Sequence, residues 1–394
     1  MANPESGRGK CYSGSPCRVL SSYAGGRPAA ARFPPGAPVR EPPASRRAPA
    51  APASLVIQTS FLGDTVLTTP LIAELARRGP VDVVAGPGGA GMLANNGDIR
   101  RLIMYDKRDA DSGMGGLWRA ARRIRQARGI GESCTAYLAQ GSVRSAVLAR
   151  LAGCAHSVGF DTSAGRWLYT RRVPYAADRH HAERLWRLAC EMPADAPAPS
   201  DALRPRLYPG QSERHAVDAL LGRSDDSRPL IGLAPGSVWA TKRWPHYADL
   251  ARRIASIARL AVIGGRDDAA LAEEIVRAAG AADTVNAVGM LSLLGSAELI
   301  GRCALLVTND SSPQHLASAM GTPTIAIFGP TVPAFGFGPL APGSLTLGHE
   351  NLDCRPCHHH GPPACPLGHW RCMKELDVSV VERAVHAALG ARTA

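Results

Sequence analysis

The chain has 394 residues, of which 45% are hydrophobic and 5% aromatic, and its formal net charge at pH 7 is +12. This length suits two domains of ordinary size, and no apolar run approaches the roughly 18 residues of a membrane-spanning helix. Half of the net charge lies in residues 1–53. The rest is modestly basic and lacks a ribbon of basic and aromatic residues, so we expect an anionic partner, such as a nucleotide or a phosphorylated lipid surface, and no nucleic acid.

Residues 1–53 are rich in Pro, Ala, Gly and Arg without periodicity, which predicts a disordered basic tail. It lacks the apolar core of a secretory signal, and it is compatible with a basic arm, a transit peptide or an over-long gene start. Ten cysteines are scattered along the chain, and without a secretory signal we expect a cytoplasmic protein with reduced thiols.

Residues 54–78 predict a strand, a glycine turn and a helix. Leu55–Ile57 is a short apolar run, Gly63 and Asp64 mark the turn, and apolar residues recur at helical spacing from Thr65. Parallel sheets bind ligands beyond the carboxyl ends of their strands, so Asp64 is a candidate general base. Alternatively, Asp64 only caps the helix.

The first half continues this alternation of strands and helices. A helix over 117–128 carries Arg122 on one face with two other arginines. That face is either solvated or contacts acidic groups of a substrate. Strands are expected at 81–85, 102–105, 137–138, 157–160 and 169–170, a flexible turn at 86–89, and a further helix at 180–191.

The second half repeats the alternation after a proline-rich linker at 193–209. We therefore predict an α/β protein with two Rossmann-like domains facing each other across a cleft, residues 54–192 and 210–394. Strands are expected at 229–234, 260–263, 304–308 and 324–328, and helices at 247–258, 268–279, 296–302 and from 313 to about 320.

Two loops of the second half carry groups that could bind phosphate. The loop PGSVWATKRWP places Ser237, Thr241 and Lys242 after a strand, and hydroxyls with an ammonium suit a pyrophosphate. A plain surface loop is the alternative.

In the second loop, Ser311 and Ser312 begin a helix, whose amino end attracts anions. His315 falls on the same helical face as Ser311, where it is either a structural group or part of the site.

A cluster near the carboxyl end contains four cysteines with several histidines nearby, spacings at which thiolate and imidazole could hold a structural zinc. No other motif in the sequence indicates a zinc ion. The four cysteines are Cys354, Cys357, Cys365 and Cys372.

Five segments together resemble the ADP-heptose:lipopolysaccharide heptosyltransferases, glycosyltransferase family 9, and are most similar to the heptosyltransferase II branch. The resemblance runs from about Ser54 to Leu389 and implies a GT-B fold, with the acceptor on the first domain and the nucleotide sugar on the second. It allows the last helix to pack back on the N-terminal domain. The segments are LVIQTSFLGDTVLTTPL, PGSVWATKRWP, VIGGRDD, TNDSSPQHLASAMGTPTIAIFGPT and CRPCHHHGPPACPLGHWRCM.

The resemblance implies inverting transfer of L-glycero-D-manno-heptose from ADP-heptose to heptosyl-Kdo2-lipid A, the inner core of lipopolysaccharide. The enzyme would act peripherally on the cytoplasmic face of the inner membrane and need no metal or other cofactor. Asp64 would be the general base. The donor would be bound by Ser237, Thr241, Lys242, Asp268, Asp310, Ser311, Ser312 and His315, and the acceptor by Gly63, Arg122, His181 and Arg184.

Some positions depart from the family pattern. Asp268 is one carbon shorter than the Glu expected at the ribose, and Ser312 and Pro313 replace a common Gly and a non-proline residue. Alternatives are a glycosyltransferase with another donor or acceptor, or a non-catalytic nucleotide- or lipid-binding homologue. An NAD-dependent oxidoreductase is disfavoured, because no G-x-G-x-x-G follows Leu55–Ile57.

Overall fold

A computed structural model describes residues 52–128, 132–190, 192–193, 196–223, 226–280 and 284–393. The tail predicted at residues 1–53 lies almost wholly outside these ranges. In the part of the chain that is described, no helix is both long and apolar enough to span a membrane.

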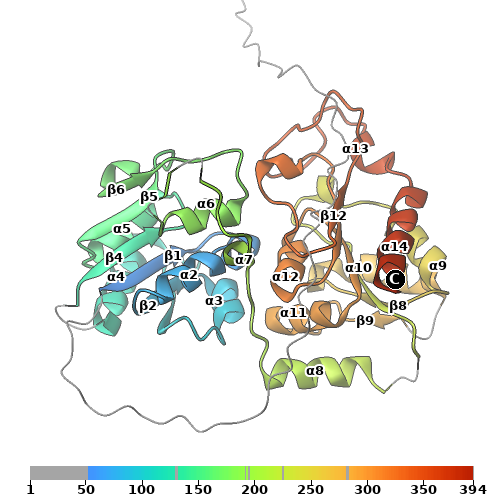
Figure 1. Cartoon of the computed structure of the whole chain (residues 1–394), viewed down its shortest axis with the longest axis horizontal. Coiled ribbons are helices and arrows are strands. Elements are labelled where there is room, and N and C mark those ends of the chain that lie inside the picture. The colour runs from blue at the N-terminus through green and yellow to red at the C-terminus, as the bar shows by residue number, and fades with distance from the viewer. Residues whose placement is uncertain are drawn as a thin grey trace, which may run out of the picture. The chain divides into compact units, whose positions relative to one another are not determined.

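The first half forms a six-stranded parallel sheet in the order β3-β2-β1-β4-β5-β6. We call this sheet and its helices the first lobe, the blue-to-green part of Figure 1. Its strands are β1 (Ala53–Gln58), β2 (Val81–Ala85), β3 (Arg101–Met104), β4 (Cys134–Leu138), β5 (His156–Phe160) and β6 (Arg171–Val173). Its helices are α1 (Leu62–Leu67), α2 (Thr69–Ala76), α3 (Pro87–Leu93), α4 (Gly113–Arg128), α5 (Val143–Leu151) and α6 (His181–Arg187).

Alternate residues of β1 face opposite sides of the sheet, and both sides are covered by helices. Leu55 and Ile57 join a hydrophobic cluster with α4 and α5, whereas Val56 packs with α2 and α6. A strand buried on both faces must be apolar throughout, which explains the uninterrupted apolar run in the sequence.

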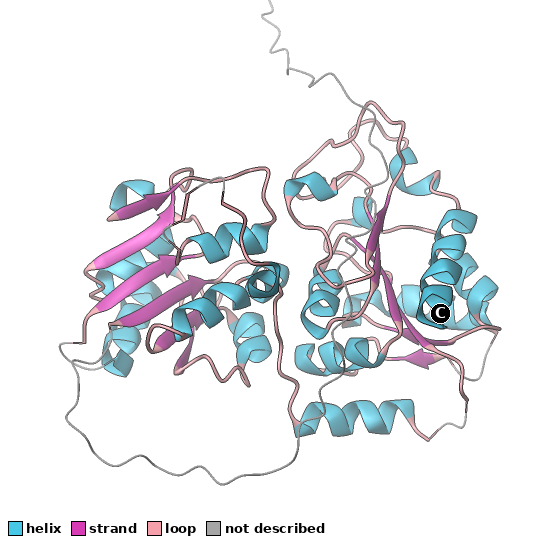
Figure 2. Cartoon of the chain, in the orientation of Figure 1, coloured by secondary structure: helices cyan, strands magenta, loops and turns pink. Residues whose placement is uncertain are grey.

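The second half forms another six-stranded parallel sheet in the order β12-β11-β10-β7-β8-β9. This second lobe again has helices on its sheet (Figure 2). Its strands are β7 (Leu230–Ala234), β8 (Arg259–Val262), β9 (Val285–Asn286), β10 (Leu305–Asn309), β11 (Thr324–Ile327) and β12 (Leu345–Leu347). Its helices are α8 (Gln211–Leu221), α9 (Tyr247–Ile254), α10 (Ala269–Ala279), α11 (Leu293–Arg302), α12 (Ser312–Met320), α13 (Arg371–Lys374) and α14 (Val378–Thr393), and α7 (Ser200–Leu203) lies in the connecting segment.

Several local expectations differ from the structure. The flexible turn expected at 86–89 is wrong, because Pro87 starts α3 and proline suits the first helical turn. The helix expected from Thr65 is two helices that adjoin at Thr68. Where the sequence allowed the last helix to pack on the N-terminal domain, α14 contacts α9, β10 and β11 of the second lobe.

One disulfide joins Cys134 of β4 to Cys154 in the loop after α5. The expectation of reduced thiols is wrong for this pair, because the fold brings the two Cα atoms to 5.1 Å, a separation that a disulfide can bridge.

A buried ion pair fixes the edge of the first sheet. Asp82 of β2 is fully buried, and Arg100 donates to both of its carboxylate oxygens, at 2.9 and 2.7 Å. Arg100 also donates to Glu132 at 2.6 Å. Removing one partner of such a pair leaves an uncompensated buried charge, which is strongly destabilising.

We therefore predict that Arg100→Ala lowers the free energy of unfolding by about 3 kcal/mol. The loss is at the low end for a buried pair, because Arg101 Nη1 remains 3.7 Å from Asp82. Chemical denaturation measures it. The matched control is Arg122→Ala, an exposed arginine whose removal should change stability by less than about 0.5 kcal/mol. Equal stabilities of the two variants would contradict the prediction.

Candidate active site

Asp64 lies on α1, just beyond the carboxyl end of β1. The N-cap residue of this helix is Phe61, so Asp64 does not occupy the capping position itself. Ser60 Oγ donates to Asp64 Oδ2 at 2.8 Å, and His181 Nε2 is 3.9 Å from Asp64 Oδ1. The carboxylate therefore has one oxygen held by a hydroxyl and the other beside an imidazole.

Burial raises the pKa of Asp64 above its ordinary value of 3.8, against the lowering effects of Ser60, His360 and the Phe61 amide. The side chain nevertheless keeps 22% of its surface exposed. A carboxylate that is partly desolvated yet reachable is a better proton acceptor than one in open water.

Gly63 brings α1 of the first lobe against α12 of the second. A Cβ at position 63 would lie only 2.6 Å from His315 Cδ2, so a larger residue there would displace the His315 ring or one of the helices. Val66 and Met92 from the first lobe share a hydrophobic cluster with Leu316 and α11. This packing places Asp64 near the amino end of α12.

The histidines around Asp64 are held neutral. Burial lowers the pKa of His181 to about 3, assisted by the charge of Arg184, and burial likewise lowers the pKa of His315 to about 3. In each ring Nδ1 is buried without a hydrogen-bond partner among the described residues. At neutral pH these rings add no positive charge that would weaken Asp64 as a base.

The cation of the site lies on the second lobe. Lys242 Nζ is 2.6 Å from Asp310 Oδ2, and both side chains are about nine-tenths buried. Asp310 also accepts from Gln314 at 2.8 Å and from Thr331 at 2.7 Å. The loop that carries Lys242 and the turn before α12 are thus joined by one ion pair.

Ser311 is the N-cap residue of α12 and Ser312 its first residue. The proline at 313 lies in the first turn, where its missing N–H has no intrahelical partner in any case. The departures from the family pattern therefore leave a regular helix start, with its free N–H groups at the same end as Asp310.

Asp268 lies beside the start of the Lys242 loop. Its Oδ2 accepts from Gly265 N at 3.0 Å, and a Cβ at Gly236 would lie 2.4 Å from the same oxygen. Ser237 follows directly and is partly exposed, with its carbonyl accepting from Arg243 Nε at 2.9 Å. The structure thus brings Asp268 next to the Lys242 loop, in which Ser237 lies.

Arg184 is buried and its guanidinium is fully engaged. It donates to the carbonyls of Ala176 and Ala177 and to the Tyr175 hydroxyl, and it reaches Phe335 O of the second lobe at 3.0 Å. These bonds favour a structural role over the acceptor contact that the sequence suggested.

The neighbours of Arg184 form a clasp, which we define as α6 together with residues 335–340. His181 N donates to Gly336 O at 2.7 Å, and His180 Nε2 is 3.0 Å from Gly338 O. The His181 ring lies 4.9 Å from that of Phe337, and Leu340 packs on the core of the first lobe.

Arg122 is not brought to the site. It is exposed on α4, which packs on α5 and β3. Its place on the solvated side of the helix agrees with the first of the two interpretations left open by the sequence.

Sequence reasoning missed the contribution of the segment that follows β12. Its His360 lies near Asp64, and Pro362 and Trp370 contact Thr241. The only sequence feature that pointed to this segment was the run of three histidines beside the cysteines. These histidines and cysteines were interpreted as potential metal ligands.

Across the described ranges, no three His, Cys, Asp or Glu side chains are grouped to hold a metal ion. Cys372 is buried in the hydrophobic core of the second lobe, whereas Cys357 is exposed. The structure thus gives no support to the zinc site at Cys354, Cys357, Cys365 and Cys372.

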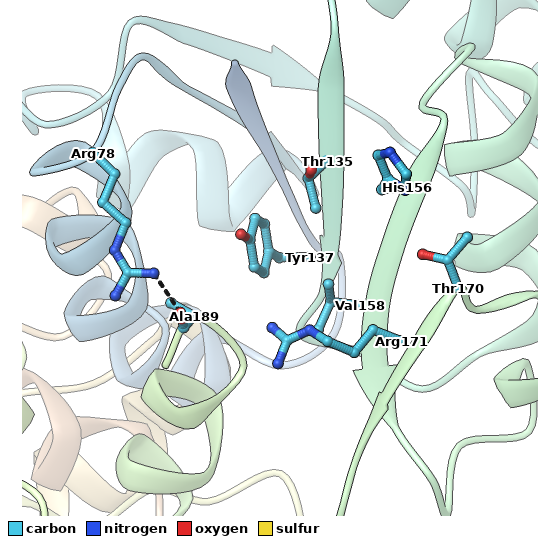
Figure 3. A pocket seen from close by; sticks show the side chains of 8 residues that line it. All are labelled: Arg78, Thr135, Tyr137, His156, Val158, Thr170, Arg171 and Ala189. Carbon is cyan, nitrogen blue, oxygen red and sulfur yellow. Dashed lines mark hydrogen bonds between the residues drawn. The ribbon is translucent and has the colours of Figure 1, made fainter. Parts of the chain in front are cut away.

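A hollow of about 500 Å³ lies elsewhere on the first lobe (Figure 3). Thr135 and His156 line it from the amino-terminal ends of β4 and β5, whereas Asp64 follows the carboxyl end of β1. Arg78 and Arg171 donate to the last carbonyls around the end of α6, which satisfies orphan acceptors of the helix. This hollow is therefore separate from the candidate site around Asp64.

Comparisons with known proteins identify the family of the chain. The sequence model of glycosyltransferase family 9 (heptosyltransferase) matches residues 123–367. Lipopolysaccharide heptosyltransferase 1 of Pseudomonas aeruginosa is 29% identical, over 77% of this chain and 85% of the relative. Lipopolysaccharide heptosyltransferase 2 of Escherichia coli is 28% identical, over 71% of this chain and 84% of the relative.

Solved structures show the same fold. The glycosyltransferase family 9 protein of Veillonella parvula has a TM-score of 0.73 at 22% identity, covering 87% of this chain and 98% of its own. The Escherichia coli ADP-heptose lipopolysaccharide heptosyltransferase II has a TM-score of 0.69 at 25% identity, covering 87% and 100%. The predicted GT-B fold is confirmed, and since the family model spans more than half of the sequence, the chain belongs to glycosyltransferase family 9, the heptosyltransferases.

Proposed function

We propose that this enzyme transfers heptose from ADP-heptose to the heptosyl-Kdo2-lipid A inner core of lipopolysaccharide, with inversion at the anomeric carbon. The observation that carries the proposal is the close packing of Gly63 on His315, because it places Asp64 beside the loops that hold Lys242 and Asp310. We propose that the proton acceptor Asp64 and the diphosphate-binding cation Lys242 act on the same sugar.

In the proposed reaction, Asp64 takes the proton of an acceptor hydroxyl as its oxygen attacks the anomeric carbon. The bond from that carbon to the phosphate oxygen breaks, and ADP leaves as an anion. Lys242 and the amino end of α12 stabilise the leaving diphosphate, so we propose that no metal ion is required.

Inversion is favoured because, of the two carboxylates Asp64 and Asp310, only Asp64 is free to take part in the reaction. Asp310 is occupied by Lys242, Gln314 and Thr331, which leaves it poorly placed to attack the sugar. Asp64 acting on a hydroxyl gives a single displacement, which inverts the configuration.

The acceptor and location are proposed from the relatives, both named for lipopolysaccharide. The identities to heptosyltransferases 1 and 2 are nearly equal, at 29% and 28%. The resemblance of the sequence motifs favours the second type. We propose that the enzyme works peripherally at the cytoplasmic face of the inner membrane, where a lipid-linked acceptor would be presented.

The test is to incubate the protein with ADP-heptose and heptosyl-Kdo2-lipid A and to weigh the lipid by mass spectrometry. Addition of one heptose supports the proposal. Transfer to Kdo2-lipid A instead would assign a different acceptor, and the absence of transfer to both would favour the alternatives, a different donor or acceptor or a non-catalytic homologue.

We predict that Asp64→Asn lowers kcat by about 10² to 10⁴, the usual contribution of a general base. Binding of ADP, measured by calorimetry, should stay within about threefold, because Asp64 does not belong to the Lys242 loop. Asp109→Asn, an exposed carboxylate in the same lobe, is the control. If Asp64→Asn or Asp64→Ala retains full transfer, the assignment of the base is wrong.

The pH profile offers a second prediction. Asp64 works only as the carboxylate and its pKa is raised above 3.8, so kcat/KM should rise with pH along an acid limb above that value. The hydrogen bond from Ser60 lowers the pKa of Asp64. Ser60→Ala should therefore move the limb to higher pH, whereas Ser212→Ala on α8 should leave it in place. A shift to lower pH would contradict this assignment.

A further inference from the structure

The segment Leu352–Trp370, which we call the histidine loop, is fastened to the donor side of the site. Thr241 Oγ1 donates to Pro362 O, and Trp370 Nε1 donates to Thr241 O at 2.8 Å. A Cβ at Gly361 would lie 3.0 Å from Lys242 Cγ. The loop therefore packs directly on the residues assigned to the diphosphate.

The base of the histidine loop is also fixed. Arg355 Nη2 donates to Phe328 O at 3.0 Å and to Thr331 O at 3.2 Å. Thr331 in turn donates to Asp310. The loop thus belongs to the same bonded network as the Lys242–Asp310 pair.

The tip of the loop reaches the first lobe. The His360 ring lies 6.2 Å from that of Phe61, which is 51% exposed and precedes Asp64 by three positions. His360 is itself exposed, so its ring is open to an incoming molecule. Burial lowers the pKa of His360, the charge of Asp64 opposes this, and His358, Lys242 and His359 add to the lowering.

His360 precedes Gly361, which packs on Lys242, and its ring lies near that of Phe61, three positions before Asp64. This places the ring close to both sides of the proposed site. The anomeric carbon must come near a hydroxyl held by Asp64, and the diphosphate near Lys242. A neutral imidazole near both groups can donate one hydrogen bond without adding a cation next to the base.

We infer that His360 is a further donor-binding residue, whose ring N–H bonds the sugar-phosphate end of the nucleotide sugar. This inference rests on the proposed function. It gives the histidine loop a role in holding the donor, separate from the metal-binding role considered from the sequence.

The neighbouring histidines are differently engaged. His358 Nδ1 accepts from His360 N at 3.0 Å, and the His359 ring lies 4.7 Å from that of Phe335. Both hold the shape of the tip. His369, later in the same loop, accepts from Arg371 N at 3.1 Å and provides a control away from the tip.

The test compares His360→Ala, His360→Gln and His369→Ala. Calorimetry with ADP-heptose should show about tenfold weaker binding for His360→Ala, partial recovery for His360→Gln, whose amide keeps an N–H donor, and a change below twofold for His369→Ala. In transfer assays, kcat/KM for the donor should fall while KM for the lipid acceptor stays constant. Thermal unfolding should be the same for all three.

A donor affinity of His360→Ala within twofold of wild type would overturn the inference, as would a loss that glutamine does not recover and that accompanies a lower Tm. If the wild type binds ADP-heptose but transfers nothing, the proposed function fails while the binding comparison still decides the role of His360. If the wild type binds no ADP-heptose, both fail.

Discussion

The site depends on one steric constraint, the contact between Gly63 and His315. Because glycine has no Cβ, helices α1 and α12, which follow strands of separate sheets, can approach each other closely at the carboxyl ends of those strands. Val66 and Met92 seal this contact by joining the hydrophobic cluster of the second lobe. Asp64, which follows Gly63, therefore lies near the amino end of α12, which attracts anions.

The charges of the site are arranged so that Lys242 pairs with Asp310 and not with Asp64. Lys242 is paired with Asp310 at 2.6 Å, which confines the positive charge to the donor side. The imidazoles of His181 and His315 are neutral at physiological pH because burial lowers the pKa of each to about 3. Burial raises the pKa of Asp64 beside the neutral imidazole of His181, which suits a group that must accept a proton.

Much of this could be predicted from the sequence, because it follows from local patterns. Apolar runs such as Leu55–Ile57 predicted the strands of both sheets. The turns after strands suggested Asp64 and Lys242 as candidate site residues, and the family resemblance added Asp310. The role of Arg184 could not be predicted, since its partners are mostly backbone carbonyls, one of them 151 positions away. His360 lies in an aperiodic loop whose placement depends on bonds to Thr241 and Phe328, and no local pattern reports such contacts.

The clasp of α6 on residues 335–340 bears on how such an enzyme can admit its substrates. The main-chain bond from His181 to Gly336 and the contact between the rings of His181 and Phe337 join the two lobes next to the segment that connects them. If the lobes separated by a hinge motion within the connecting segment alone, the contacts of the clasp would break. A motion in which residues 335–340 move together with the first sheet would preserve these contacts. The chain would then bend where residues 335–340 join the rest of the second lobe, and this segment would act as the hinge.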